Sequence, residues 1–156
     1  MHNVIRPLLL VATLLMASGA QADDLTPAQL KMRSAILNFI KDEGFSPYID
    51  EDDGSVTFKR EGITYWVTVE NENPFYLEVH RSGLGIDDAD RSKLLYAVNE
   101  ANRTIRSAKA MLNTSNISFA VEIYCHSVEE FKYIFYKCLS CLQAIKEKVS
   151  SLYNDD

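Results

Sequence analysis

The sequence lacks the short motifs that are typical of common enzyme classes. It contains no glycine-rich phosphate loop and no Gly-x-Ser-x-Gly nucleophile elbow, so a P-loop nucleotide site and a serine hydrolase of that kind are not indicated. It also has no internal repeat, no low-complexity stretch and no linker rich in proline and serine. No cysteine precedes Cys125, so a lipoprotein cleavage site near the N-terminus is excluded. These absences favour one globular unit without a recognisable catalytic motif.

The first 22 residues have the three parts of a secretory signal peptide. Arg6 precedes an apolar run over Leu8–Met16, and small residues follow up to Ala20-Gln21-Ala22. The apolar run is roughly half of the about 20 residues that a helix needs to cross a bilayer. We therefore expect cleavage after Ala22, a periplasmic or secreted location, and no membrane anchor.

The chain after the expected cleavage site, residues 23–156, has the length of a common domain and is long enough to bury a core without disulfides or metals. The formal net charge of the whole chain is −6, and loss of Arg6 with no acidic residue makes it −7. An acidic protein is repelled by phosphate groups, which argues against nucleic acid or an anionic membrane as the partner. We expect a single α+β domain.

Apolar residues at helical spacing predict two of the helices. Thr26-Pro27-Ala28-Gln29 has the form of a capping box with proline in the first turn, and Gly44 is expected to end this helix. Its buried face would consist of Leu30, Ile36, Leu37 and Ile40. Asp87 or Asp88 is expected to cap a second helix, whose apolar pattern ends near Asn102. The residues of this helix expected to face inward are Leu94, Leu95, Val98 and Ala101.

A third, longer helix is predicted at the C-terminus. Ser127-Val128-Glu129-Glu130 has the form of a second capping box. The apolar stripe that follows it consists of Phe131, Ile134, Phe135, Cys138, Leu142, Ile145, Val149 and Leu152. A helix with such a continuous stripe is expected to lie across a sheet.

Alternation with a period of two predicts strands between the helices. Turns at Asp53-Gly54, Glu61-Gly62 and residues 71–74 separate short strands, the last of which continues to about His80. A hairpin of residues 105–112 and 117–125 is expected between the second and third helices. The order helix, meander, helix, hairpin, helix predicts an α+β fold with an antiparallel sheet and helices mainly on one of its faces.

This order of elements resembles that of YbjN-like domains. Three local features resemble them as well: a helix that ends at Gly44-Phe45, the acidic turn Asp52-Asp53-Gly54, and paired strands around Gly62. These domains are similar in fold to type III secretion chaperones. The resemblance covers most of the chain after residue 22. It implies a protein-binding module, often dimeric and acidic, and it carries over no catalytic residues. Because such chaperones act in the cytoplasm, the expected signal peptide means that a role in effector export does not transfer.

The three cysteines are odd in number, so at least one thiol is unpaired within a monomer. Cys138 and Cys141 have redox-motif spacing but lie well inside the predicted helix, whereas a reactive pair sits at a helix N-terminus, where the dipole lowers the thiol pKa. Cys125 and Cys138 fall on apolar stripes and are expected to be core residues. Cys141 is offset from the apolar stripe of its helix, so the sequence does not decide whether it is buried.

Only His80 and His126 remain as histidines after the expected cleavage, and both are predicted on the sheet face opposite the core. Neither has a second ligand at a known zinc spacing, and carboxylates such as Glu78 and Glu122 are common in an acidic protein. We therefore predict no metal site and no cofactor.

The predicted strands turn three large aromatic side chains away from the core. The parity that buries Tyr65, Leu77 and Ile123 directs Trp66, Tyr76 and Tyr124 to the opposite face, which also carries His80. Exposed aromatic clusters mark binding surfaces. The alternatives are ordinary cross-strand pairs or cover by a helix. With these alternatives open, Trp66, Tyr76, Tyr124 and His80 are the candidate partner-binding residues.

Three classes of function are compatible with the sequence. We expect first a non-enzymatic, chaperone-like module that binds another polypeptide or a second copy of itself. The second is an inhibitor of the immunity type, because a small acidic exported protein suits neutralisation of a basic toxin. The third is an enzyme that uses a thiol or a metal, or else a protein that binds a small molecule or a metal.

Overall fold

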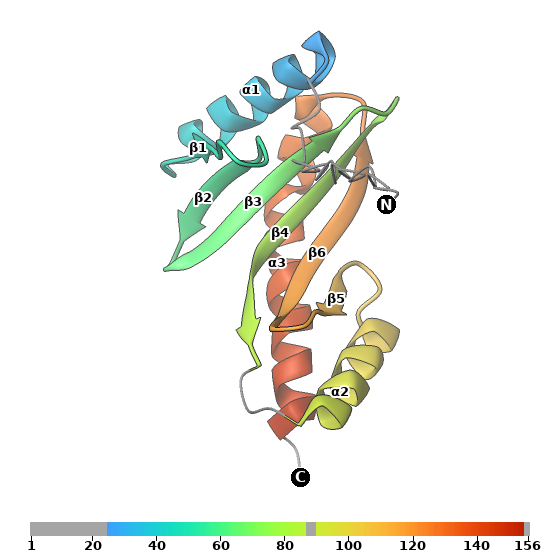
Figure 1. Cartoon of the computed structure of the whole chain (residues 1–156). Helices are drawn as coiled ribbons and strands as arrows, with labels where there is room; N and C mark the ends of the chain where they lie inside the picture. The colour runs from blue at the N-terminus through green and yellow to red at the C-terminus, as the bar shows by residue number, and fades with distance from the viewer. Residues whose placement is uncertain (1–24, 87–89, 155–156) are drawn as a thin grey trace, which may run out of the picture.

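The computed structural model describes residues 25–86 and 90–154 (Figure 1). The signal-peptide prediction concerns residues outside these ranges. The elements are α1 (Pro27–Asp42), β1 (Tyr48–Ile49), β2 (Val56–Arg60), β3 (Ile63–Glu70), β4 (Phe75–Gly85), α2 (Arg91–Thr104), β5 (Lys109–Leu112), β6 (Asn116–Cys125) and α3 (Val128–Asn154).

The strands form one six-stranded sheet in the order β1-β2-β3-β4-β6-β5, and every neighbouring pair is antiparallel. Figure 1 shows α3 crossing behind the sheet, with α1 at the upper end and α2 at the lower end of α3. The α+β fold predicted from the sequence is thus confirmed, including the antiparallel meander and the hairpin.

The core lies between the sheet and the helices and is rich in phenylalanine. The ring of Phe135 on α3 packs against Phe39 of α1 at a centroid distance of 5.2 Å, against Phe58 of β2 at 5.7 Å and against Phe131 at 5.6 Å. Phe58, Phe131 and Phe135 are fully buried. Burial of three such rings supplies several kcal/mol each, at about 25 cal/mol per Å² of apolar surface.

The start and the end of α1 agree with the prediction, but its buried face is rotated. The Thr26 hydroxyl accepts from the Gln29 backbone N–H, and the Gln29 side chain accepts from the Thr26 backbone N–H. Gly44 follows the helix with φ of +89°, which favours glycine. Leu30, predicted to be buried, is 41% exposed. Gln29 is buried instead, because its amide donates to the Val69 carbonyl and so ties α1 to β3.

β4 is longer than predicted, because it continues past His80 to Gly85. The register with β6 shifts between Arg81 and Leu84, as expected for a bulge. Gly83 lies in this irregular stretch, where an added Cβ would come within 1.7 Å of the Ile117 carbonyl oxygen. Only glycine permits this close approach of the two backbones.

The N-cap and the buried face of α2 differ from the prediction. Asp90 is the N-cap, with its carboxylate accepting from the backbone N–H groups of Ser92 and Lys93, whereas the predicted caps Asp87 and Asp88 lie outside the described residues. Leu95 is 51% exposed. The buried positions are Leu94, Ala97, Val98 and Ala101, which keep strict helical spacing toward α3.

The strand predicted from residue 105 begins only at Lys109, because Ile105 still closes α2 with a hydrogen bond to the Ala101 carbonyl. Asn102 then joins the two elements. Its amide donates to the Ala110 carbonyl at 2.9 Å and accepts from the Ala110 N–H at 2.8 Å.

The stripe of α3 is broader than predicted. Ile134 and Leu152 are only partly buried, while Leu139 and Cys141 join the core. The predicted capping box is half formed: the Glu130 N–H donates to the Ser127 hydroxyl, but the Glu130 carboxylate accepts from the His126 N–H and not from Ser127. The wider stripe reflects a helix covered by α1 and α2 as well as by the sheet.

Candidate functional site

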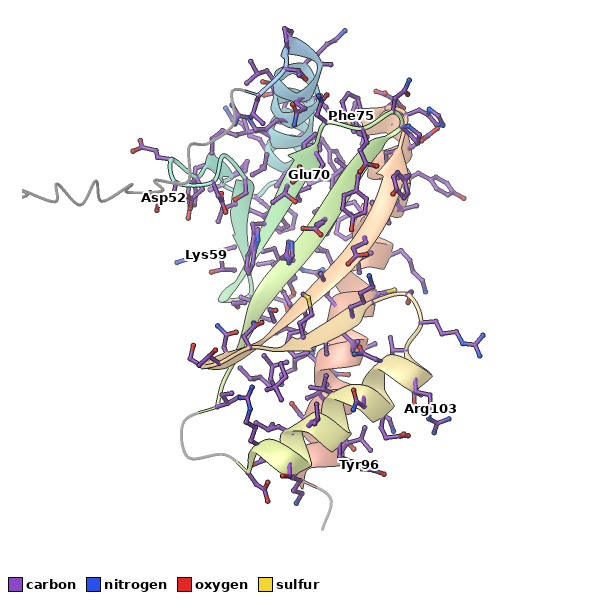
Figure 2. All side chains as sticks on the ribbon, turned by 45° about the vertical axis from the view of Figure 1, so that its right-hand side comes forward. Asp52, Lys59, Glu70, Phe75, Tyr96 and Arg103 are labelled. Atoms are coloured by element: carbon purple, nitrogen blue, oxygen red, sulfur yellow. The ribbon has the colours of Figure 1, made fainter. Side chains whose placement is uncertain are left out.

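The face of the sheet that points away from α3 is called the outer face below. Residues directly opposite each other in an antiparallel pair share a face. Trp66 lies opposite His80 across β3 and β4, and Tyr76 lies opposite Tyr124 across β4 and β6. All four candidate partner-binding residues therefore share the outer face, as predicted. In Figure 2, no helix of the described ranges lies over this face.

Trp66 and His80 form the first aromatic pair. Their ring centroids are 5.0 Å apart and their planes differ by 7°, a stacked arrangement. The His80 side chain is 13% exposed, because the indole covers it on one side. Its Nε2 lies 3.1 Å from Glu78 Oε2, while Nδ1 is buried without a hydrogen-bond partner. The stack thus fixes the imidazole ring against β3.

Tyr76 and Tyr124 form the second aromatic pair. Their centroids are 5.2 Å apart with planes tilted by 48°. Tyr76 is half-buried and donates its hydroxyl hydrogen to Glu78 Oε1 at 3.3 Å. Tyr124 is 60% exposed. An exposed aromatic ring held by a second ring offers apolar contact area that is already ordered, which favours binding.

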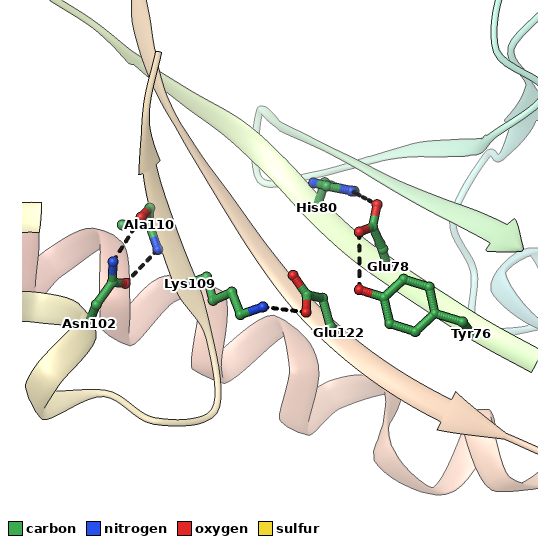
Figure 3. Close-up of polar contacts among 7 residues, drawn as sticks. All are labelled: Tyr76, Glu78, His80, Asn102, Lys109, Ala110 and Glu122. Carbon is green, nitrogen blue, oxygen red and sulfur yellow. Dashed lines mark hydrogen bonds and ion pairs between the residues drawn. The ribbon is translucent and has the colours of Figure 1, made fainter. Parts of the chain in front are cut away.

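Carboxylates surround the Tyr76 hydroxyl (Figure 3). Glu78 lies opposite Glu122 across β4 and β6. Burial, together with hydrogen bonding and the negative charges of Glu122 and Glu78, raises the pKa of the Tyr76 hydroxyl. The ammonium group of Lys109, which pairs with Glu122, holds the pKa of that carboxyl below its usual value. The outer face therefore presents aromatic rings within a framework of carboxylates.

This framework was not identified from the sequence. The sequence pattern marks Glu78 and Glu122 only as acidic residues near histidines, and it gives no signal for Lys109. Strand alternation places Glu78 and Glu122 on the outer face, but the partner strand of each residue depends on the order of the sheet. The only available signal was the shared parity of Tyr76, Glu78 and His80.

The prediction that His126 lies on the outer face of the sheet is wrong, because His126 is not part of a strand. β6 ends at Cys125, and His126 lies beyond it, exposed, beside the turn of residues 71–75. Within the described ranges, no group of three or more histidine, cysteine, aspartate or glutamate side chains is arranged to hold a metal ion.

The thiols lie on the core side and are free. Cys141, left open by the sequence, is buried, and its sulfur accepts a hydrogen bond from the Ser107 hydroxyl at 3.1 Å. Burial raises the pKa of Cys125 to about 11 and that of Cys138 to about 12. A reactive thiol needs a lowered pKa and solvent access. The arrangement therefore gives no support to thiol chemistry.

A cavity of about 860 Å³ lies between the start of α1, the turn of residues 50–54 and the end of β3. Ser55, which lines it, is buried and shares a hydrogen bond with Thr57. Arg33, which also lines the cavity, donates a hydrogen bond to the Gly54 carbonyl. None of the four residues of the aromatic pairs lines this cavity.

Considered over residues 25–86 and 90–154, no helix combines the length and apolar character that crossing a membrane requires.

Comparison with known proteins agrees with this architecture. Residues 33–128, more than half of the chain, match the family model YbjN, described as "Putative bacterial sensory transduction regulator". The match extends from within α1 to the start of α3 and so includes all six strands and the four residues of the two aromatic pairs. No curated protein and no solved structure gives a significant match. The resemblance inferred from the sequence is thus confirmed, and the chain belongs to the YbjN family.

Proposed function

We propose that this chain is a non-enzymatic, exported binding module that holds a partner polypeptide on its outer face. The observation that carries the proposal is the juxtaposition of the Trp66–His80 and Tyr76–Tyr124 pairs on a sheet face that no described helix covers. The family description, a regulator of sensory transduction, favours a binding role over catalysis.

The energetic basis is burial of ordered aromatic surface. Residues that dominate binding energy are most often tryptophan, tyrosine and arginine, and removal of one costs about 2 kcal/mol or more at a hot spot. Trp66 and Tyr76 are each held by a second ring, so little side-chain entropy is lost when a partner covers them.

The test is capture of the partner by the tagged protein. The chain would carry a C-terminal tag in its native host, be recovered after mild crosslinking, and be compared with the double variant Trp66→Ala/Tyr76→Ala. We expect one polypeptide in near-equal amount with the unaltered chain and at least a tenfold loss with the variant. The matched control is Tyr96→Ala/Tyr133→Ala, which removes two tyrosines 60% and 92% exposed on α2 and α3.

Equal capture by the folded outer-face variant and by the control would refute the outer face as the binding site. N-terminal sequencing of the recovered protein tests export in the same experiment. A first residue of Asp23 supports cleavage after Ala22, and an intact N-terminus contradicts it.

A basic toxin as that partner is the second candidate, favoured by the formal net charge of −6. Opposite charge accelerates association and makes it sensitive to salt. A captured partner with a net negative charge would exclude the toxin-inhibitor hypothesis while leaving the binding module intact.

A further inference from the structure

One half of strand β6 has a neighbouring strand on one side only. β4 pairs with β6 along its length, whereas β5 pairs only with residues 117–120. In the described part of the chain no strand pairs with residues 121–125 on the side away from β4. Residues 121–125 are called the open edge below.

The open edge is chemically able to accept another strand. In an antiparallel pair, alternate residues direct both their N–H and C=O groups toward the same neighbour, so every second residue of the open edge directs them away from β4. Its sequence, Val-Glu-Ile-Tyr-Cys, contains no proline, and every residue keeps its donor. Such a row is a template for pairing with another chain.

The side chains of the open edge define the character of an added strand. Glu122 and Tyr124 lie on the outer face, where Tyr124 is 60% exposed. Ile123 lies on the core face but is only partly buried. A strand beside them would bury apolar side chains next to Ile123 and place its alternate side chains next to Glu122 and Tyr124. This requires alternation of apolar and polar residues.

The charge near the open edge favours a basic polar position. Glu122 lies within it, and the Glu130 carboxylate accepts a hydrogen bond at 2.7 Å from the backbone N–H of His126, the residue that follows the open edge. Lys109, the first residue of β5, pairs with Glu122. A lysine or arginine in the added strand would meet two carboxylates and one ammonium group.

We propose that the open edge binds an extended segment of the partner, alternating apolar with polar and basic residues, as a seventh strand of the sheet. This inference rests on the proposed function, because the segment lies beside Tyr124 and so continues the outer-face surface. Main-chain hydrogen bonds supply affinity in this mode, and alternate side chains supply specificity.

The test uses a library of random 12-residue peptides selected on the purified protein. The best binder is then synthesised in three forms: unmodified, N-methylated at odd positions, and N-methylated at even positions. N-methylation removes the backbone donor and blocks the paired side of the residue. We expect one methylated form to lose at least tenfold in affinity and the other to stay within about threefold, since only the first loses the backbone donors that pair with the open edge.

Two protein variants and one mapping experiment accompany the peptides. Tyr124→Ala is expected to weaken binding about tenfold. Tyr96→Ala, which removes an equally exposed tyrosine on α2 at the lower end of the molecule (Figure 2), is expected to leave binding unchanged. Hydrogen exchange is expected to show protection of alternate amides among residues 121–125 when the unmodified peptide binds.

Equal affinity of both methylated forms, protection that misses the open edge, or failure to select any peptide would overturn the added strand. The two proposals fail separately. Binding that tolerates both methylations but is lost in Trp66→Ala/Tyr76→Ala overturns the seventh strand and leaves the outer-face function standing. Binding that depends on methylation parity but is unaffected by that double variant supports the open edge and removes the aromatic surface from the binding function.

Discussion

Trp66 and His80, fourteen positions apart in the chain, stack face to face across β3 and β4 with their ring centroids 5.0 Å apart. Trp66 is the only tryptophan of the chain. Its fluorescence therefore reports on the outer face alone.

Replacement of His80 by alanine should uncover one face of the Trp66 ring. We expect the emission maximum of His80→Ala to move to longer wavelength, because water replaces the imidazole against the indole. The measurement is the emission spectrum under native conditions. His126→Ala is the matched control and should leave the spectrum unchanged, because His126 lies beyond the end of β6. A spectrum of His80→Ala identical to that of the unaltered chain would contradict the stack.

The buried thiols predict a loss of stability at alkaline pH. Burial raises the pKa of Cys125 to about 11 and that of Cys138 to about 12, from the ordinary value of 9.0. The folded state keeps both protons where the unfolded chain releases them. The contribution of these two thiols to the free energy of unfolding is therefore fully present below about pH 9. It is lost as the pH rises through the folded-state pKa values of about 11 and about 12.

Thermal unfolding followed by circular dichroism between pH 8 and 10.5 measures this loss. We expect Tm to fall over this range, and to fall less steeply in Cys125→Ala/Cys138→Ala. The comparison concerns the slope, since the double variant also starts from a lower Tm because of lost core contacts. Parallel slopes would show that other groups cause the alkaline loss.

Arg81 of β4 forms a hydrogen bond with Gln143 of α3. The Arg81 side chain, in a residue only 5% exposed, donates from Nη1 to Oε1 of Gln143 at 2.6 Å, while Nε is buried without a partner. We expect Gln143→Ala to lower the free energy of unfolding by about 1–3 kcal/mol, because it leaves the guanidinium less satisfied. Arg81→Met should be close to neutral or stabilising, because it removes the buried charge and keeps an aliphatic side chain in the same place.

Urea unfolding of both variants measures this difference. The prediction fails if Arg81→Met destabilises the protein more than Gln143→Ala, which would mean that the charge itself contributes to stability.

Asn102 holds β5 to the end of α2 through two hydrogen bonds with Ala110. Asn102→Ala should lower the free energy of unfolding by about 1–3 kcal/mol, because both backbone groups of Ala110 lose their partner. Asn102→Asp should not restore it, because a carboxylate cannot donate to the Ala110 carbonyl. Urea unfolding gives the free energy, and hydrogen exchange at residues 109–112 should accelerate in both variants. Full stability of Asn102→Asp would contradict the donor role.

The sequence by itself predicted most of the secondary structure, because helix caps and side-chain periodicity are local properties. The capping box of Thr26 and Gln29 and the parity of Trp66, Tyr76, His80 and Tyr124 follow from near neighbours in the chain. Local spacing was less informative where a helix has neighbours on several sides. Leu30 and Leu95 have apolar side chains at helical spacing, yet the docking angle of each helix leaves them exposed.

Only the tertiary structure decided which residues of the outer face meet. Parity assigns Tyr76 and Tyr124 to a face, but their contact requires β6 to lie beside β4, although β5 precedes β6 in the chain. The same strand order brings Lys109 to Glu122 and leaves residues 121–125 without a second neighbour. Such pairings are set by burial of the whole sheet against α3, a sum over distant contacts that no local pattern contains.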